Sequence, residues 1–132
     1  MSRMFYGVAG GFFALLLCAC IFGAQDLKGV WAGTLIQKGP GDKTYSYSVK
    51  MELNGASGII DYPELDCGGT LTLLKKTGNV YYYRESITYG KDKCADGGTL
   101  AIEPSGNSVK WDWTLSDMPD VTTSGVLWGM RK

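Results

Sequence analysis

The feature that most constrains this chain is a regular alternation of apolar and polar residues. In TYSYSVKMELN (44–54), tyrosine, valine, methionine and leucine occupy every second position, with serine, lysine and glutamate between them. NSVKWDWTLS (107–116) alternates in the same way. Successive side chains of a β-strand point to opposite faces, so this period of two predicts strands with one buried face.

Further strand-like segments follow one another along the chain, separated by turn residues. They lie at 30–37, 58–62, 70–76, 80–89, 99–103 and 121–131. The breaks between strands include Gly-Pro-Gly-Asp, Asn-Gly, Thr-Gly-Asn and Pro-Ser-Gly-Asn, which favour turns. Because the connections are mostly short, the sequence predicts an all-β fold, a small antiparallel up-and-down β-barrel of about eight strands.

The first residues have the composition of an export signal. MSRMFYGVAGGFFALLLCACIFGAQ carries one arginine near its start and no charge from Met4 to Ala24. Its glycines suit a core helix badly. LCAC, which ends at Cys20, resembles a bacterial lipobox, in which the cysteine is acylated. A signal cut after Ala24 and an uncut span over Met4–Ala24 are the alternatives.

All three forms of the signal place the rest of the chain outside the cytoplasm. We therefore expect an export signal over 1–20, a tether over 21–28 and a β-barrel domain over 29–132. With acylation at Cys20, the barrel is a lipoprotein held at a membrane by its lipid anchor, on the periplasmic or cell-surface side.

Two cysteines remain once the signal is set aside. Cys67 and Cys94 each stand shortly before the same four residues, Gly-Gly-Thr-Leu. In a meander, the strands that begin near 70 and near 99 run in the same direction, so both cysteines lie at one rim. A lone pair in an exported domain predicts a Cys67–Cys94 disulfide, which should stabilise the fold by roughly 3 to 4 kcal/mol.

Charge and composition limit the classes of function. The chain has 13 Lys and Arg, 13 Asp and Glu, and no basic patch, so we expect no nucleic-acid partner. It has no histidine, which removes the commonest general base and metal ligand. We therefore expect no metal site, and we expect no cofactor. We also expect no catalytic residues, because neither a Ser/His nor a Cys/His pair can form.

One acidic residue lies among aromatic residues on a predicted strand face. Tyr81, Tyr83 and Glu85 share one side of the segment 80–89, and Trp111 and Trp113 share one side of another strand. A carboxylate that faces a barrel interior must be paired, hydrogen-bonded or protonated. These five residues could line a small-molecule site; the alternative is an internal ion pair or hydrogen bonds to tyrosine hydroxyls.

Two other aromatic residues lie opposite the main apolar set of their strands. Tyr82 and Trp128, if exposed, are the candidates for contact with a protein partner. An eight-stranded barrel is just wide enough to fill itself with side chains or to hold one small ligand. The many large aromatics favour a filled barrel, so the sequence favours a protein-binding module at the cell envelope, such as an inhibitor of an envelope enzyme or toxin. The alternative is a small-molecule-binding barrel.

Two resemblances to known families agree with the predicted barrel and with a binding role. Gly29-Val30-Trp31, together with Arg131 near the end, resembles the calycins (lipocalins and avidin), in which a first-strand tryptophan packs under a last-strand basic side chain and closes the barrel. GVWAGTLIQ, YPELDCGG, YRESITYGKDKCADGG and VKWDW, within residues 29–115, resemble a small bacterial exported domain family found as lone lipoproteins and as extracytoplasmic parts of membrane kinases. That resemblance implies a sensing or binding role.

Overall fold

A computed structural model describes residues 27–130, which form eight β-strands. The strands are β1 (Lys28–Lys38), β2 (Thr44–Asn54), β3 (Ser57–Tyr62), β4 (Cys67–Thr77), β5 (Val80–Tyr89), β6 (Thr99–Ser105), β7 (Ser108–Thr114) and β8 (Thr122–Gly129). Every segment predicted to be a strand contains or lies within one of these strands. β4 is longer than expected, because it begins at Cys67 itself.

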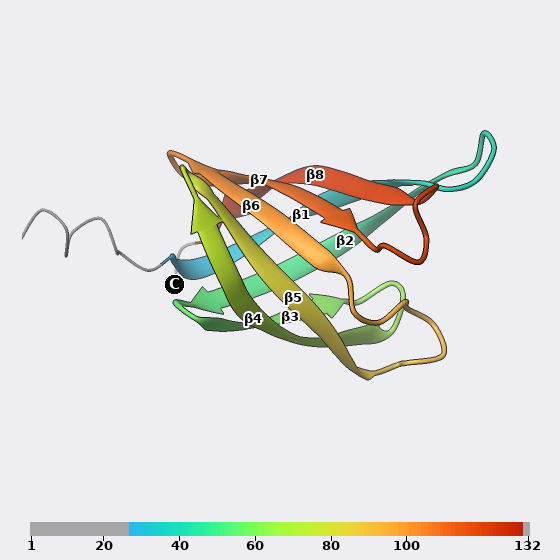
Figure 1. The fold of residues 1–132 in the computed structure, drawn as a ribbon, viewed down its shortest axis with the longest axis horizontal. Coiled ribbons are helices and arrows are strands. Elements are labelled where there is room, and N and C mark those ends of the chain that lie inside the picture. The colour runs from blue at the N-terminus through green and yellow to red at the C-terminus, as the bar shows by residue number, and fades with distance from the viewer. Residues whose placement is uncertain (1–26, 131–132) are drawn as a thin grey trace, which may run out of the picture.

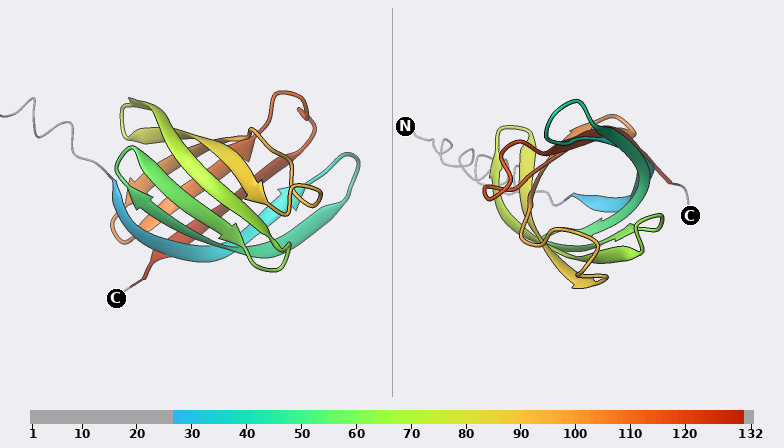
Figure 2. Two further views of the ribbon diagram at one scale, coloured as in Figure 1. Left: turned by 90° about the horizontal axis from the view of Figure 1, so that it is seen from below. Right: turned by 90° about the vertical axis from the view of Figure 1, so that its right-hand side faces the viewer.

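The strands form a closed antiparallel barrel in which each pairs with its neighbours in the sequence (Figure 1). The last strand closes the ring on the first, with Trp31 opposite Gly129 and Lys38 opposite Thr122. Figure 2 shows this ring in the view along the barrel. The predicted up-and-down barrel is therefore confirmed, and over residues 27–130 it leaves no unpaired sheet edge.

Most of the barrel interior is filled by the apolar side chains that the alternation predicts. Every second residue of β2, β5, β6 and β7 is buried over most of each strand. The largest fully buried apolar side chains are Trp111, Tyr83, Leu35, Met51, Leu53, Leu71, Leu100, Ile102 and Leu127. Their burial removes a large apolar area from water, which is the main force that stabilises such a fold.

The two ends of the barrel differ in their connections (Figures 1 and 2). At one end, residues 55–56, 78–79 and 106–107 form tight turns between strands. At the other end, longer segments connect the strands: 39–43, 63–66, 90–98 and 115–121. We call these the turn end and the loop end.

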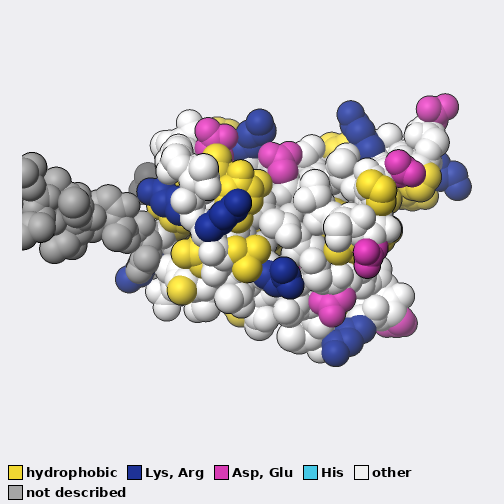
Figure 3. Space-filling view, in the orientation of Figure 1, with side chains coloured by type: hydrophobic (Ala, Val, Ile, Leu, Met, Phe, Trp, Pro, Cys, Tyr) yellow, Lys and Arg dark blue, Asp and Glu magenta, His cyan; other side chains and the backbone are white. Residues whose placement is uncertain are grey.

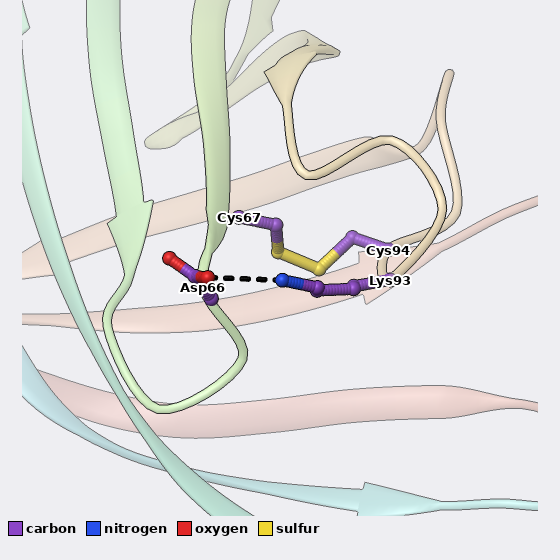
Figure 4. A network of polar contacts seen from close by, with 4 residues as sticks. All are labelled: Asp66, Cys67, Lys93 and Cys94. Carbon is purple, nitrogen blue, oxygen red and sulfur yellow. Dashed lines mark hydrogen bonds and ion pairs between the residues drawn. A yellow bond between two sulfur atoms is a disulfide. The ribbon is translucent and has the colours of Figure 1, made fainter.

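A disulfide and an ion pair tie two connections together at the loop end. Cys67, the first residue of β4, is bonded to Cys94 in the 90–98 loop, with their Cα atoms 6.3 Å apart. Beside it, Lys93 Nζ lies 2.9 Å from Asp66 Oδ2 (Figure 4). The predicted disulfide is thus confirmed, and the two cysteines meet at one rim as the meander required.

Some predictions concern residues outside the described range. The export signal over 1–20 with its acylation site at Cys20, most of the tether over 21–28, and Arg131 all lie there. Trp31, the proposed partner of Arg131, is buried at the turn end, where its ring packs against Gly29. Over residues 27–130, no helix is long and apolar enough to cross a membrane.

Candidate functional site

A cavity of about 200 Å³ lies inside the barrel at the loop end. Its polar and aromatic wall is formed by Gln37, Tyr47, Tyr62, Glu85, Trp111, Trp113 and Thr123. Loop residues cover it, namely Leu65, Lys93, Cys94, Ala95, Met118 and Val121. Four of these residues also line an open groove of about 670 Å³, so the cavity reaches solvent beside the 63–66 and 90–98 loops.

Glu85 is the central polar residue of the cavity. It lies on β5 opposite Leu71 of β4, and only 1% of its surface is exposed. The Tyr62 hydroxyl donates a hydrogen bond of 2.5 Å to Oε2, and Trp113 Nε1 donates one of 3.0 Å to Oε1. The bond from Tyr62 is the kind of contact expected for a carboxyl group among aromatic residues, namely a hydrogen bond from a tyrosine hydroxyl.

The Glu85 carboxyl group lacks a counter-ion within residues 27–130. No lysine or arginine of this range forms an ion pair with it. Lys93, the lysine among the loop residues that cover the cavity, is paired with Asp66. Burial raises the pKa of Glu85, the hydrogen bonds from Tyr62 and Trp113 oppose this shift, and the charge of Asp96 adds to it. Burial also raises the pKa of Tyr62 well above its ordinary value, which keeps this hydroxyl protonated as a donor.

Backbone hydrogen bonds hold the 90–98 loop against β5 around this carboxyl group. The Glu85 N–H donates to the Gly98 carbonyl at 2.9 Å, and the Gly97 N–H donates to the Glu85 carbonyl at 3.2 Å. Two residues further along β5, the Ile87 N–H donates to Asp96 Oδ1 at 2.8 Å. The loop is thereby fixed beside the cavity by polar contacts as well as by the disulfide.

The repeated Gly-Gly-Thr-Leu sequence has a packing reason. In each copy the second glycine, Gly69 or Gly98, is buried and stands two residues before a buried leucine. A Cβ atom at Gly98 would collide with Nε1 of Trp113, the atom that donates to Glu85. At Gly69 it would collide with the backbone carbonyl of Ser86. Both glycines allow close approach of a neighbour next to Glu85.

Trp111 also lines the cavity, and its indole N–H differs from that of Trp113 in its hydrogen bonding. Its side chain is 1% exposed, and Nε1 has no hydrogen-bond partner in residues 27–130. A buried indole N–H usually has a partner, because leaving it unpaired costs roughly 1 to 3 kcal/mol. Across the same cavity, the Tyr47 hydroxyl donates to Gln37 Oε1 at 2.7 Å.

The structure divides the five residues predicted to line an interior site into two groups. All five are buried, but only Glu85, Trp111 and Trp113 reach the cavity. Tyr81 and Tyr83 lie nearer the turn end, where the Tyr83 hydroxyl donates to the Gly55 carbonyl at 2.8 Å and Lys76 Nζ lies 5.0 Å from the Tyr81 ring centroid. These two tyrosines belong to the packed part of the interior.

Four polar wall residues escaped the sequence reasoning, namely Gln37, Tyr47, Tyr62 and Thr123. Tyr47 and Tyr62 continue the inward-facing alternation of β2 and β3, with Val49 and Ile60 respectively. Thr123 has the same phase as buried Leu127 on β8. The signal that could have found them is therefore the alternation itself, extended to the last inward position before each loop-end connection.

The two residues considered for protein contact differ in exposure. Trp128 is 60% exposed on the outer face of β8, whereas Tyr82 is partly buried, with Lys75 Nζ 5.1 Å from its ring centroid. Figure 3 shows hydrophobic side chains gathered at the turn end of the β4–β6 face, beside positively charged side chains. Trp128 is thus the more available of the two aromatic residues.

Residues 27–130 contain no group of three or more His, Cys, Asp or Glu side chains arranged to hold a metal ion. The chain matches no protein-family model, no curated protein and no solved structure. The resemblances to the calycins and to the exported domain family therefore stay predictions, and the function has to be argued from the cavity.

Proposed function

We propose that this protein is a non-catalytic binding protein that holds a small molecule in the loop-end cavity. The observation that carries the proposal is the state of Glu85 at the cavity wall. It is a buried carboxyl group without a counter-ion within residues 27–130. A ligand that supplies a complementary group offsets the cost of burying this carboxyl group.

The size and lining of the cavity also favour a small molecule. Its volume of about 200 Å³ exceeds the roughly 150 Å³ of an engineered protein cavity that binds benzene. Ligand sites are typically concave and aromatic with a few polar groups, and this cavity has that composition. Within the alternatives that the sequence left open, the cavity favours the small-molecule-binding barrel.

Native mass spectrometry of the protein isolated from its own cells tests this proposal. We expect a reproducible added mass on the order of 100 Da that is lost on mild denaturation. Mild unfolding and refolding should then yield the bare chain, which serves as the control. A bare chain directly after isolation, together with failure to bind any small aromatic probe, would contradict the proposal.

A protein partner is the second candidate, favoured by an apolar stripe on the outer wall. Trp128 is 60% exposed and Val126 49%, two residues apart on β8, and Ile36 is 40% exposed on β1, diagonal to Val126. An envelope enzyme or toxin inhibited through this face is the form that we predict from the sequence. A co-purifying second chain that is lost in Trp128→Ser would support this candidate; retention of that chain would rule out this face.

We further propose that the barrel is exported and anchored as a lipoprotein through Cys20. The support is the apolar, uncharged segment from Met4 to Ala24 and the Leu-Cys-Ala-Cys sequence within it. Cys20→Ser should abolish lipid attachment and leave an unprocessed or soluble chain. A mature, membrane-associated Cys20→Ser chain whose mass differs only by the substitution would contradict the proposal.

A further inference from the structure

We infer that the ligand of the loop-end cavity is a small organic cation, a protonated amine that the Glu85 carboxylate attracts and the aromatic wall surrounds. This inference rests on the proposed function, because it names the chemical class that the proposed site takes. It is carried by the charge and by the side-chain types of the cavity wall.

The charge argument concerns the groups that face Glu85 from each neighbouring element. Tyr62 on β3 and Trp113 on β7 donate hydrogen bonds to its two oxygens, and Tyr47 on β2 is a further neutral hydroxyl at the wall. Asp96 in the 90–98 loop adds negative charge, while Lys93 is already paired with Asp66. Positive charge is therefore what this part of the cavity lacks within residues 27–130.

The wall also has the side chains that stabilise a cation after it leaves water. Tyr47, Tyr62, Trp111 and Trp113 all line the cavity, and the rings of Tyr47 and Tyr62 meet edge to face with centroids 6.0 Å apart. Aromatic faces attract cations electrostatically, most strongly where water is excluded. An anion of the same size should bind more weakly, because the negative charge of the Glu85 carboxylate repels it.

The same geometry couples binding to protonation. A cation favours the ionised form of Glu85, so its binding should lower the pKa that burial raises. Amine binding should therefore weaken on acidification as Glu85 takes up a proton. A neutral ligand of the same shape has no net charge for the carboxylate to attract, so its binding should change much less over that range.

Three probes of matched shape test the inference on the full-length chain: benzylamine, benzyl alcohol and benzoate. Binding is measured by isothermal titration calorimetry near neutral pH and at a series of lower pH values. We expect benzylamine to bind at least about tenfold more tightly than benzyl alcohol near neutral pH, with benzoate the weakest. This preference should decrease as the pH is lowered and Glu85 takes up a proton. Equal binding of the amine and the alcohol, or preference for benzoate, would overturn the inference.

A pair of variants assigns the preference to one carboxyl group. Glu85→Gln keeps one carbonyl oxygen that can accept from Trp113 Nε1, and its amide NH2 can donate to the Tyr62 hydroxyl oxygen. It removes the charge, and should bring benzylamine and benzyl alcohol within about threefold of each other. Glu52→Gln, the same change at an exposed position on β2, should leave the tenfold preference intact. Loss of preference in both variants would contradict the role of Glu85. The pH dependence in the unaltered protein tests the same point if Glu85→Gln does not fold.

The outcomes separate the two claims. If benzyl alcohol or benzoate binds as tightly as benzylamine or more tightly, with Trp fluorescence changed by the probe, the cation inference fails and the binding cavity stands. If none of the three probes binds and the chain is bare directly after isolation, the proposed function fails, and the cation inference fails with it.

Discussion

The turn end and the loop end of this barrel use the same eight strands for different purposes. At the turn end, short connections join strands whose inward side chains, such as Leu53, Ile102 and Leu127, are almost completely buried. At the loop end, longer connections cover a cavity whose wall includes the buried polar residues Glu85 and Thr123. The contrast indicates that close packing stabilises the turn end, whereas the loop end depends on the disulfide and leaves room for the proposed binding site.

Removal of the disulfide should have the largest effect on stability. Cys67→Ala with Cys94→Ala opens a link over 27 residues of sequence separation, and the unfolding free energy should fall by roughly 3 to 4 kcal/mol. Because Cys94 lines the cavity, benzylamine binding should weaken as well. Urea denaturation and calorimetry measure the two effects. A loss below about 1 kcal/mol would show that the loops are held mainly by their other contacts.

A core truncation at the turn end should affect stability alone. Leu127 is fully buried, so Leu127→Ala should cost about 3 kcal/mol through lost burial and a new cavity. The affinity for benzylamine should stay within about twofold, since the site lies at the other end. A large loss of affinity in a variant that remains folded would contradict the division between the two ends.

A side chain at Gly98 should affect the site through Trp113. Gly98→Ala places a Cβ atom against the indole nitrogen that donates to Glu85, and should destabilise the fold by about 1 to 3 kcal/mol. It should also weaken probe binding. Gly39→Ala, at a glycine with open space around it, is the matched control and should be nearly neutral. Similar effects of the two substitutions would exclude this packing role of Gly98.

The smallest predicted effect is a pH dependence of stability. Burial raises the folded-state pKa of Glu85, so the folded chain holds this proton more tightly than the unfolded chain. This proton therefore adds to the free energy of unfolding. The contribution is present below the ordinary glutamate pKa, about 4.3, and is lost as the pH rises through the folded-state pKa of Glu85. Glu85→Gln should flatten this decline relative to Glu52→Gln in denaturation curves taken at several pH values. Parallel curves for the two variants would contradict the assignment.

The contrast between the two ends also marks how far sequence reasoning reaches. The alternation in β2, β5 and β7 predicts the strands and most of the filled interior, because a period of two depends only on local backbone geometry. The pairing of Cys67 with Cys94 follows from topology and from the small number of cysteines. These predictions are independent of the detailed shape of the interior.

The cavity could not be predicted in the same way. Its wall depends on where the loops cover the barrel, and on contacts such as those of Tyr62 and Trp113 with Glu85, whose sequence separations of 23 and 28 residues no local pattern contains. Tyr81 and Glu85 share one strand face, yet they lie toward opposite ends of the barrel and have different surroundings. The alternation predicts the strand face on which a side chain lies, but not its position along the barrel axis.

The most direct test of the loop-end site uses the four tryptophans as reporters in one NMR titration of indole N–H signals with benzylamine. Trp111 and Trp113 line the cavity, Trp31 is buried at the turn end and Trp128 lies on the outer wall. We predict saturable shifts of the Trp111 and Trp113 signals, with the Trp31 and Trp128 signals nearly unchanged. A shift confined to Trp128, or no saturable shift at Trp111 and Trp113, would contradict the account.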